Sequence, residues 1–242
     1  MWPDGYAKRV LPEVDSTNAE AARIAPDLAG PEWILGLRQT AGRGRRGRAW
    51  VNPEGNFTAT LVMRPLEAPD VIALRSFVAS LALYDAFAQV TGTDAGLSLK
   101  WPNDVLLNGG KVAGILLEGS PGYLAIGIGV NLIAAPDASQ VEAGAVSPVS
   151  LLAETGVRLT PEAFLTALAQ AYAKWERTFT TFGFAPVREA WLSRAARLGE
   201  TITARTTQQE TVGVFETVDA EGNLVLKTPK ARVAIAAADV FF

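Results

Sequence analysis

The chain has 242 residues, of which 49% are hydrophobic and 19% are charged, so it can bury one large core and still carry a smaller second domain. Its 22 basic and 25 acidic residues give a net charge of −3, which argues against broad binding to a nucleic-acid backbone. It contains no histidine and no cysteine, and this excludes a Ser-His-Asp hydrolase, a histidine-based zinc enzyme and a disulfide framework.

The N-terminal part predicts a strand, a helix and a second strand. Residues 1–5 contain no signal-peptide core, and no apolar run in the chain reaches membrane-spanning length, so we expect a cytoplasmic protein. Asp15 and Ser16 offer an N-cap for the helix, and Pro26 ends it. The predicted ranges are 9–14 for the first strand, 17–24 for the helix and 33–37 for the second strand.

A basic, glycine-rich loop follows at residues 38–48, where the sequence R-Q-T-A-G-R-G-R-R-G-R holds five arginines and three glycines. Glycines let backbone N–H groups turn toward one ligand, and guanidinium groups form charge-assisted hydrogen bonds to phosphate or carboxylate. The loop matches G-x-G-x-x-G, but residues 51–56 read as loop rather than as the helix that a dinucleotide site requires. The loop alone therefore leaves two alternatives open, an ordered anion site and a solvated basic segment that binds nucleic acid.

The middle of the chain predicts a mainly antiparallel sheet with helices packed on it. Apolar residues alternate over 56–63, which predicts a strand with one buried face, and helical periodicity over 69–90 predicts a long helix. Asn108-Gly109 is a strong hairpin signal, since both central residues of a type I′ turn need positive φ. The other predicted strands cover residues 97–101, 105–107, 112–118 and 123–130.

The character of the sequence changes after Asn131. Residues 134–149 are rich in Ala, Pro, Ser and Gly without a periodic pattern, which predicts a long mobile loop of the kind that often acts as a lid. Two helices are predicted at 161–179 and 186–197, followed by a Val- and Thr-rich stretch that predicts a small β-barrel. We therefore expect a catalytic domain over residues 1–197 and a small C-terminal domain over residues 198–242.

Three motifs occur in order along the first domain. They are residues 39–48 of the basic loop, Lys100-Trp101-Pro102-Asn103-Asp104-Val105 with Lys111 to Leu116 after it, and Ile126-Gly127-Ile128-Gly129-Val130-Asn131. Together with Ser16-Thr17-Asn18 upstream, they resemble the catalytic domain of the biotin protein ligases. The resemblance is specific from about residue 14 to residue 131 and looser through the C-terminal domain.

The resemblance implies a class II synthetase-like α+β fold, with a mainly antiparallel sheet, packed helices and a small C-terminal SH3-like β-barrel. It implies an enzyme that activates biotin with ATP and Mg²⁺ to biotinyl-5′-AMP. The biotinyl group then passes to one lysine of a biotin carboxyl carrier protein. A lipoate or octanoate ligase or transferase would share the fold, and a nucleic-acid module is a third hypothesis. A ligand-induced thermal shift with biotin against lipoate separates the first two, and a gel shift tests the third.

The resemblance also implies which residues bind each substrate. Catalytic roles fall to Lys111, Arg45 and Asp104, because a carboxylate that meets the α-phosphate of ATP needs lasting positive charge, and an incoming amine needs a carboxylate to accept its proton or orient it. The biotin-binding residues are Ser16, Thr17, Asn18, Gln39, Arg43, Gly44, Arg45, Lys111, Gly114, Gly127 and Gly129. The residues for ATP and the adenylate are Arg43, Arg45, Arg46, Arg48, Trp50, Asn103, Lys111 and Asn131.

Simpler structural roles remain open beside these assignments. Ser16 and Thr17 also suit a helix cap, Trp50 and Trp101 suit a core, and Gly114 suits a bulge. The repulsion among the arginines of the basic loop predicts that residues 40–50 are mobile without ligand and become ordered over the adenylate.

The sequence also departs from its relatives in two respects. Bifunctional members of the family carry an N-terminal helix-turn-helix domain, but the first motif here begins at Ser16, so we expect a ligase with neither nucleic-acid nor membrane partners. Some members pack a tryptophan of the loop after the Gly-x-Gly-x-Asn strand on the adenine, yet residues 134–149 hold no aromatic residue. Val141 and Val146 are the sizeable apolar candidates there. Metal ligands and the oligomeric state, with a homodimer allowed, stay open.

Overall fold

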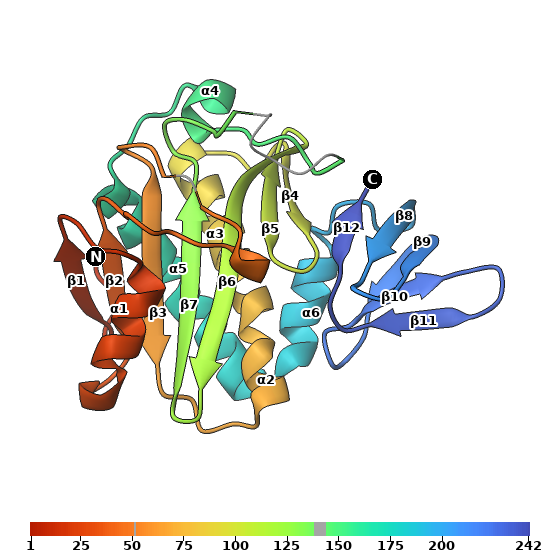
Figure 1. The fold of residues 1–242 in the computed structure, drawn as a ribbon, viewed down its shortest axis with the longest axis horizontal. Helices are drawn as coiled ribbons and strands as arrows, with labels where there is room; N and C mark the ends of the chain where they lie inside the picture. The colour runs from red at the N-terminus through yellow and green to blue at the C-terminus, as the bar shows by residue number, and fades with distance from the viewer. Residues whose placement is uncertain (51, 138–143) are drawn as a thin grey trace.

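The computed structural model describes residues 1–50, 52–137 and 144–242, and its elements form two sheets joined by helices (Figure 1). The larger sheet has seven strands in the order β1-β2-β3-β7-β6-β5-β4. Its strands are β1 (Ala7–Leu11), β2 (Glu32–Gly36), β3 (Phe57–Met63), β4 (Leu97–Lys100), β5 (Asp104–Leu107), β6 (Gly110–Ser120) and β7 (Tyr123–Val130). The pair β1–β2 is parallel and the other neighbours are antiparallel, so the predicted α+β class with a mainly antiparallel sheet is confirmed.

Helices cover both faces of this sheet. The short helix α1 lies on one face, while α3 and α5 cover the other (Figure 1). The helices are α1 (Thr17–Ile24), α2 (Pro69–Ala73), α3 (Arg75–Thr91), α4 (Leu151–Thr155), α5 (Pro161–Phe182) and α6 (Phe184–Leu192), with single 3-10 turns at η1 (Ala25–Asp27) and η2 (Arg45–Gly47).

The main core lies between the larger sheet and the pair α3 and α5. Phe57 of β3 meets Phe164 of α5 at 5.1 Å between ring centroids, and Phe87 of α3 meets the same ring at 5.2 Å. Helical residues Pro69–Thr91 are long and apolar enough to cross a membrane by length and composition, but 67% of the most apolar window is buried inside the protein. This stretch is therefore best explained as a core element of the fold.

The prediction of one buried face for β3 is wrong, because all seven of its residues are buried. Phe57, Ala59 and Leu61 face the main core, as predicted. The opposite face also has a cover, since Val62 packs with Ala21 of α1 in a second, smaller core. Nothing in the alternation of β3 itself could reveal that α1 returns over it.

The predicted bounds of the other helices and turns agree with the structure in some places and differ in others. The predicted helix over 69–90 is interrupted at Leu74, so it forms α2 and α3, and the last predicted helix ends at Leu192 rather than near residue 197. The single-turn helix α4 was not predicted from the sequence. The hairpin at Asn108-Gly109 is confirmed, with φ of 50° and 80°.

The C-terminal residues form a separate five-stranded antiparallel sheet in the order β11-β10-β9-β8-β12. Its strands are β8 (Thr201–Arg205), β9 (Glu210–Val218), β10 (Leu224–Lys227), β11 (Arg232–Ile235) and β12 (Asp239–Phe241). Trp191 of α6 packs on Phe215 of this sheet, and Trp101 donates a hydrogen bond from Nε1 to the carbonyl of Gly222 at 3.1 Å. These contacts hold β12 beside the larger sheet (Figure 1).

Candidate active site

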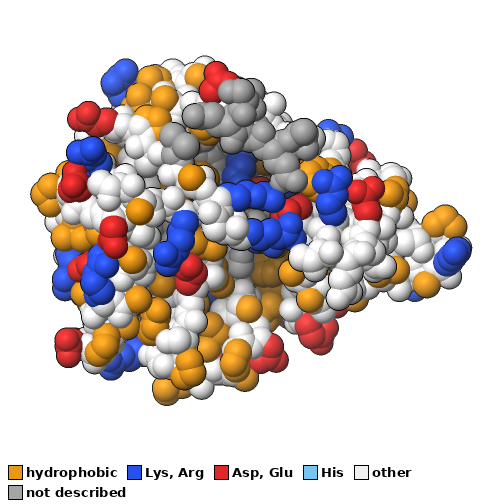
Figure 2. All heavy atoms as spheres, in the orientation of Figure 1, with side chains coloured by type: hydrophobic (Ala, Val, Ile, Leu, Met, Phe, Trp, Pro, Cys, Tyr) orange, Lys and Arg blue, Asp and Glu red, His pale blue; other side chains and the backbone are white. Residues whose placement is uncertain are grey.

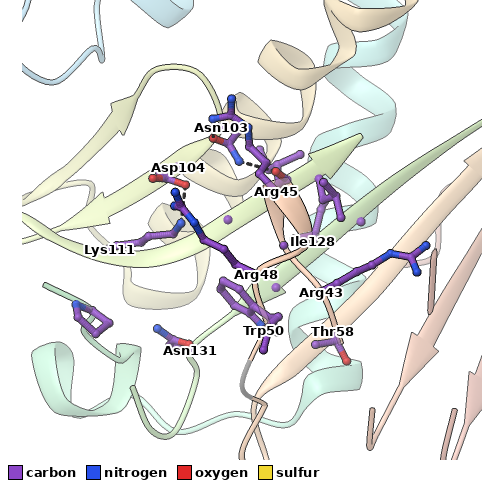
Figure 3. Close-up of a pocket in the computed structure, with 18 of the residues that line it drawn as sticks. Arg43, Arg45, Arg48, Trp50, Thr58, Asn103, Asp104, Lys111, Ile128 and Asn131 are labelled. Atoms are coloured by element: carbon purple, nitrogen blue, oxygen red, sulfur yellow. Dashed lines mark hydrogen bonds and ion pairs between the residues drawn. The ribbon is translucent and has the colours of Figure 1, made fainter. Parts of the chain in front are cut away.

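A cavity of about 260 Å³ opens between the larger sheet, the basic loop and strand β12. Figure 2 shows lysine and arginine side chains gathered around a hollow between the larger sheet and the C-terminal sheet, and Figure 3 shows the side chains that line it. All of the predicted catalytic and substrate-binding residues line this cavity, with the exception of Arg46. Segments that are far apart in the sequence thus supply one site.

The floor of the cavity is made by strands β6 and β7, where three glycines let side chains lie flat on the backbone. A Cβ atom at Gly129 would overlap the Trp50 ring, and one at Gly127 would overlap the carboxamide of Asn18. A Cβ at Gly114 would lie 3.3 Å from Cε of Lys111 and 3.4 Å from the Trp50 ring. Glycine is needed at residues 127 and 129 because Asn18 and Trp50 occupy the space above them, whereas at Gly114 the contact is only tight.

One end of the cavity is a buried polar cluster built on the N-terminus of α1. The Ser16 hydroxyl caps the helix by accepting a hydrogen bond from the N–H of Ala19 at 3.4 Å, and Ser16 also lines the cavity. Gln39 Oε1 accepts hydrogen bonds from the Thr17 N–H at 2.8 Å and from the Thr17 hydroxyl at 3.1 Å. The helix-cap role and the position beside the cavity therefore occur together in Ser16.

The same cluster extends toward the basic loop through Asn18. Its carboxamide Nδ2 donates to Glu118 at 2.8 Å, and Arg43 donates to the same carboxylate at 3.2 Å. Thr60 of β3 lies 2.6 Å from Asn18 Oδ1 and 2.8 Å from the Thr17 hydroxyl. Donors and acceptors here are fixed in position before any ligand binds, which favours a ligand with both kinds of polar group.

Charged side chains gather at the next part of the cavity around Asp104 (Figure 3). Lys111 Nζ lies 2.7 Å from Asp104 Oδ1, and Lys100 Nζ lies 3.7 Å from Oδ2. Burial alone would raise the pKa of Asp104, but the charges of Lys111 and Lys100 hold the pKa below its ordinary value. Burial lowers the pKa of the Lys100 ammonium group, although Asp104 opposes this effect.

The arginines of the basic loop are matched with oxygen acceptors. Arg45 is half-buried and donates to Asn103 Oδ1 at 3.3 Å and to the carbonyl of Ala238 at 3.4 Å, and its burial lowers the pKa of its guanidinium group. Arg46 and Arg48 both donate to Asp239 Oδ2, at 2.5 and 3.1 Å. Asp239 and Glu118 thus offset part of the repulsion on which the expected mobility of residues 40–50 rests. That mobility stays a prediction.

Asn131 lies at the end of β7 and is only 2% exposed. Its Nδ2 donates to the carbonyl of Val149 at 3.0 Å, while its Oδ1 has no hydrogen-bond partner among the described residues. A buried acceptor without a partner costs free energy, so a ligand N–H group would stabilise this position. Asn103 donates a hydrogen bond from Nδ2 to the carbonyl of Ile115 at 2.6 Å. This bond fixes the Asn103 side chain, whose Oδ1 accepts a hydrogen bond from Arg45.

The structure brings further residues to the site that were not among the predicted ones. Lys100 stood in a recognised motif but was assigned no role, and Thr58 of β3 was read only as part of a strand. Asp239 and Phe241 line the cavity from β12, and no local sequence signal marks them. Arg46, which was assigned to the adenylate, pairs with Asp239 instead of lining the cavity. Val141 lies outside the described residues, while Val146 lines the cavity.

The described residues contain no group of three or more His, Cys, Asp or Glu side chains that could hold a metal ion. Of the carboxylates around the cavity, Asp104 is paired with lysine and Asp239 with arginine. Within the described part of the chain, the site therefore offers cations and amides to its ligands rather than a carboxylate cage.

The cavity thus places fixed cations beside a polar cluster, an arrangement that suits a ligand with both an anionic group and a neutral polar group. Residues 10–132 match the model of the Biotin/lipoate A/B protein ligase family, and residues 198–242 match that of the Biotin protein ligase C terminal domain. The chain belongs to the biotin/lipoate A/B protein ligase family.

Individual relatives agree with this assignment. The chain is 57% identical over 238 residues to the biotin–acetyl-CoA-carboxylase ligase of Paracoccus denitrificans, covering 96% of this chain and 99% of that protein. It is 32% identical to the bifunctional ligase/repressor BirA of Bacillus spizizenii, covering 94% of this chain and 71% of that protein. The solved structure of the biotin protein ligase from Aquifex aeolicus in complex with biotin and ATP has a TM-score of 0.84 at 25% identity and covers 97% of each chain.

Proposed function

We propose that this protein is an ATP-dependent biotin protein ligase. It activates biotin to biotinyl-5′-AMP and transfers the biotinyl group to a lysine of the carrier domain of acetyl-CoA carboxylase. One observation carries the proposal: a single cavity joins the polar cluster of Thr17 and Gln39 to the charged cluster of Lys111, Lys100 and Asp104. The relatives named for this reaction, one of them 57% identical over nearly the whole chain, give it independent support.

The polar cluster suits the ureido ring of biotin. That ring presents a carbonyl acceptor and two N–H donors, and the hydroxyl of Thr17 and the carboxamide of Gln39 can serve both kinds of group. A lipoyl group would bring an apolar dithiolane ring to the same place and leave buried polar atoms without a ligand partner. The cavity therefore favours biotin over lipoate or octanoate.

In the first step, a carboxylate oxygen of biotin bonds to the α-phosphorus of ATP, and the bond from that phosphorus to the bridging oxygen of pyrophosphate breaks. Negative charge concentrates on the phosphoryl oxygens as pyrophosphate leaves. Lys111 and Arg45, with Lys100 beside them, are the fixed cations around that centre. Cations held in advance within a half-buried site stabilise such charge without reorganisation of solvent.

In the second step, the lysine nitrogen of the carrier bonds to the acyl carbon, the bond from that carbon to AMP breaks, and AMP leaves with the electron pair. The nitrogen loses a proton in the process, and this proton passes to solvent water. Because the pKa of Asp104 is held below its ordinary value, its carboxylate is a weak base. We therefore assign Asp104 to the orientation of the incoming amine once the phosphate of the adenylate has drawn Lys111 away from it.

Mg²⁺ reaches the site on the phosphates of ATP in this proposal. Its ordinary mode of binding uses one or two carboxylates together with phosphates and water, and both nearby carboxylates, Asp104 and Asp239, already have cationic partners. The ion would help to neutralise the phosphate oxygens before pyrophosphate leaves.

We further propose a cytoplasmic enzyme that acts on protein rather than nucleic acid. The net charge of −3 argues against broad binding to a nucleic-acid backbone, which depends on many unopposed basic side chains. A gel shift with duplex DNA at physiological salt, with and without biotinyl-5′-AMP, tests whether the protein binds nucleic acid. Light scattering on the purified protein decides between a monomer and a homodimer.

The experiment that tests the proposed activity is biotin-dependent exchange between ATP and labelled pyrophosphate. We expect exchange without any carrier protein, because the residues assigned to biotin and to phosphate are in place in one chain. Lipoate should not replace biotin. Absence of exchange with either acid would contradict the proposed function, and exchange with lipoate alone would move it to the other branch of the family.

A further inference from the structure

The tip of the basic loop contacts the C-terminal sheet, and one carboxylate lies at the centre of that contact. Arg46 donates a hydrogen bond to Asp239 Oδ2 at 2.5 Å, and Arg48 donates to the same oxygen at 3.1 Å. Arg45 Nη1 lies 3.8 Å from Asp239 Oδ1 and donates to the carbonyl of Ala238 at 3.4 Å. Three guanidinium groups of one loop thus converge on two consecutive residues of the C-terminal sheet region.

The body of the basic loop is closed by its own hydrogen bonds. The Trp50 N–H donates to the Gly42 carbonyl at 3.0 Å, and the Gly44 N–H donates to the Arg48 carbonyl at 2.7 Å. These bonds pair the two sides of the loop like a short hairpin and leave the turn η2 at its end. The contact with Asp239 therefore decides where that turn lies, because the hairpin shape already has hydrogen bonds of its own.

The backbone of Arg46, in the middle of the turn, is strained. Its φ of 57° and ψ of 26° lie in the left-handed region, which is unfavourable for a residue with a Cβ atom. Such a conformation persists where the surrounding contacts hold it. The hydrogen bond from Arg46 to Asp239 is a contact of this kind, so its loss should let the turn relax away from the C-terminal sheet.

Asp239 is itself fixed in position. It begins strand β12, its backbone pairs with Arg205 of β8, and its neighbours Ala238 and Val240 are buried. Strand β12 is the part of the C-terminal sheet that lies nearest the larger sheet (Figure 1). A side chain on a packed strand is placed more precisely than one on a loop. The carboxylate of Asp239 is therefore a fixed point to which the arginines of the loop are held.

The charge of Asp239 is offset by the cations around it. In the proposed function the cavity accepts phosphate groups, which a lone carboxylate in its wall would repel. Two guanidinium groups bind this carboxylate directly and a third lies close to it, so the cations outnumber the anion. Arg45 still lines the cavity, where it donates to Asn103 Oδ1 at 3.3 Å. Asp239 thus arranges cations for a ligand and is not a ligand contact itself.

We propose that Asp239 is a positioning residue that holds the tip of the basic loop against β12 and thereby keeps Arg45 over the cavity. The carboxylate acts through Arg46 and Arg48. The inference rests on the proposed function in one respect, since biotinyl-5′-AMP is the ligand that the loop retains. The C-terminal sheet then controls how firmly the loop covers the reactive intermediate, although it supplies no group to the reaction.

Limited digestion with trypsin tests the contact without any substrate. Trypsin cleaves after arginine, and Asp239→Asn leaves every arginine of the loop unchanged. Cleavage of a folded protein follows the population of the locally opened form. The full-length variants Asp239→Asn and Asp239→Glu are digested without ligand, and mass spectrometry locates the cuts. Glu216→Gln is the matched control, because Glu216 binds Arg232 within the same sheet at 2.6 Å and lies outside the cavity lining.

We expect Asp239→Asn to be cut after Arg45 and Arg46 roughly three- to thirtyfold faster than the unaltered protein, the range for loss of a partly exposed charge pair. Asp239→Glu keeps the charge and should be cut at a rate near that of the unaltered protein, and so should Glu216→Gln. Cuts elsewhere in the chain should keep their rates, which separates a loosened loop from general damage. Thermal denaturation shows that each variant is folded.

Release of the adenylate gives a second measurement. Asp239→Asn should still form biotinyl-5′-AMP from biotin and MgATP but release it faster by a similar factor. Effects of independent substitutions on the release rate would multiply. Because Arg46→Gln removes part of the same contact, Asp239→Asn should accelerate release less in the Arg46→Gln background than in the unaltered protein.

Equal loop cleavage in Asp239→Asn and the unaltered protein would overturn the proposal. Equal acceleration by Asp239→Asn and Asp239→Glu would also overturn it, since packing rather than charge would then hold the tip, and so would fully multiplicative effects of Asp239→Asn and Arg46→Gln on release. The digestion needs no substrate, so these outcomes can be told apart from a failure of the proposed function, which would show as an unaltered protein without biotin-dependent exchange.

Discussion

Replacement of Lys111 by alanine should reduce catalysis strongly and stability only slightly. Lys111 Nζ lies 2.7 Å from Asp104 Oδ1, where the gross attraction of two unit charges is about 6 kcal/mol at an effective dielectric constant of about 20. The desolvation of both groups opposes most of this attraction. Lys111 is 31% exposed, and Lys100 remains 3.7 Å from the same carboxylate, so we expect a net loss of stability of only about 1–3 kcal/mol.

Lys111→Ala should lower the rate of adenylate formation far more than its effect on stability can explain. Removal of one preorganised cation from a developing anionic centre lowers the rate by roughly two to three orders of magnitude. A domain of ordinary stability, about 5–15 kcal/mol, stays almost entirely folded after the loss estimated for Lys111→Ala. Unfolding therefore cannot account for a hundredfold loss of adenylate formation.

Biotin-dependent ATP–pyrophosphate exchange and thermal denaturation measure the two effects. Lys174→Ala is the control, because Lys174 pairs with Asp85 on the surface and is 68% exposed. In the double variant Lys111→Ala/Asp104→Asn, adenylate formation should stay as low as in Lys111→Ala, because the loss comes from the missing cation and not from the carboxylate left behind. Adenylate formation at the unaltered rate in Lys111→Ala would refute the role given to Lys111.

Three other outcomes follow from the same structure. Arg45→Gly should still form some biotinyl-5′-AMP but release it faster, so that lysines of bystander proteins become labelled; an unchanged release rate would show that Arg45 does not retain the adenylate. Gly129→Ala should displace the Trp50 ring and weaken biotin binding by about tenfold or more, whereas Gly30→Ala, where a Cβ meets nothing within 4 Å, should bind biotin normally in calorimetry. Burial, reinforced by a nearby glutamate, raises the pKa of Tyr6 from 10.0 to about 12. Its contribution to stability should be complete below pH 10.0 and lost as the pH rises through about 12, and phenolate absorbance that shows every tyrosine ionised near pH 10.0 would contradict this.

The elements that the sequence predicted well are those with local signals. The helix over residues 17–24 was predicted with its observed bounds, because Ser16 caps it and Pro26 follows it. The hairpin at Asn108-Gly109 was equally clear, because the positive φ angles restrict the choice of residues. The break at Leu74 had no such signal, since neither glycine nor proline marks it.

The candidate site was predicted to the extent that its residues stand in motifs. Lys111, Asp104 and Arg45 come from separate motifs, and all three line one cavity. Asp239 and Phe241 could not be predicted, because Asp239 meets Arg46 across 193 positions of sequence and only the packing of the C-terminal sheet brings the two together. For the same reason, the repulsion predicted among the arginines from the sequence was too strong, because the carboxylates that offset it lie far away in the chain.

The most direct test of the central claim is transfer to a carrier. The purified protein is incubated with biotin, MgATP and the isolated carrier domain of acetyl-CoA carboxylase, and the carrier is analysed by intact-mass and peptide mass spectrometry. The account predicts one added biotinyl group on one lysine, dependent on ATP and formed roughly a hundredfold or more slowly by Lys111→Ala at the same enzyme concentration. A carrier that stays unmodified with biotin, or that is acylated equally well with lipoate, would contradict it.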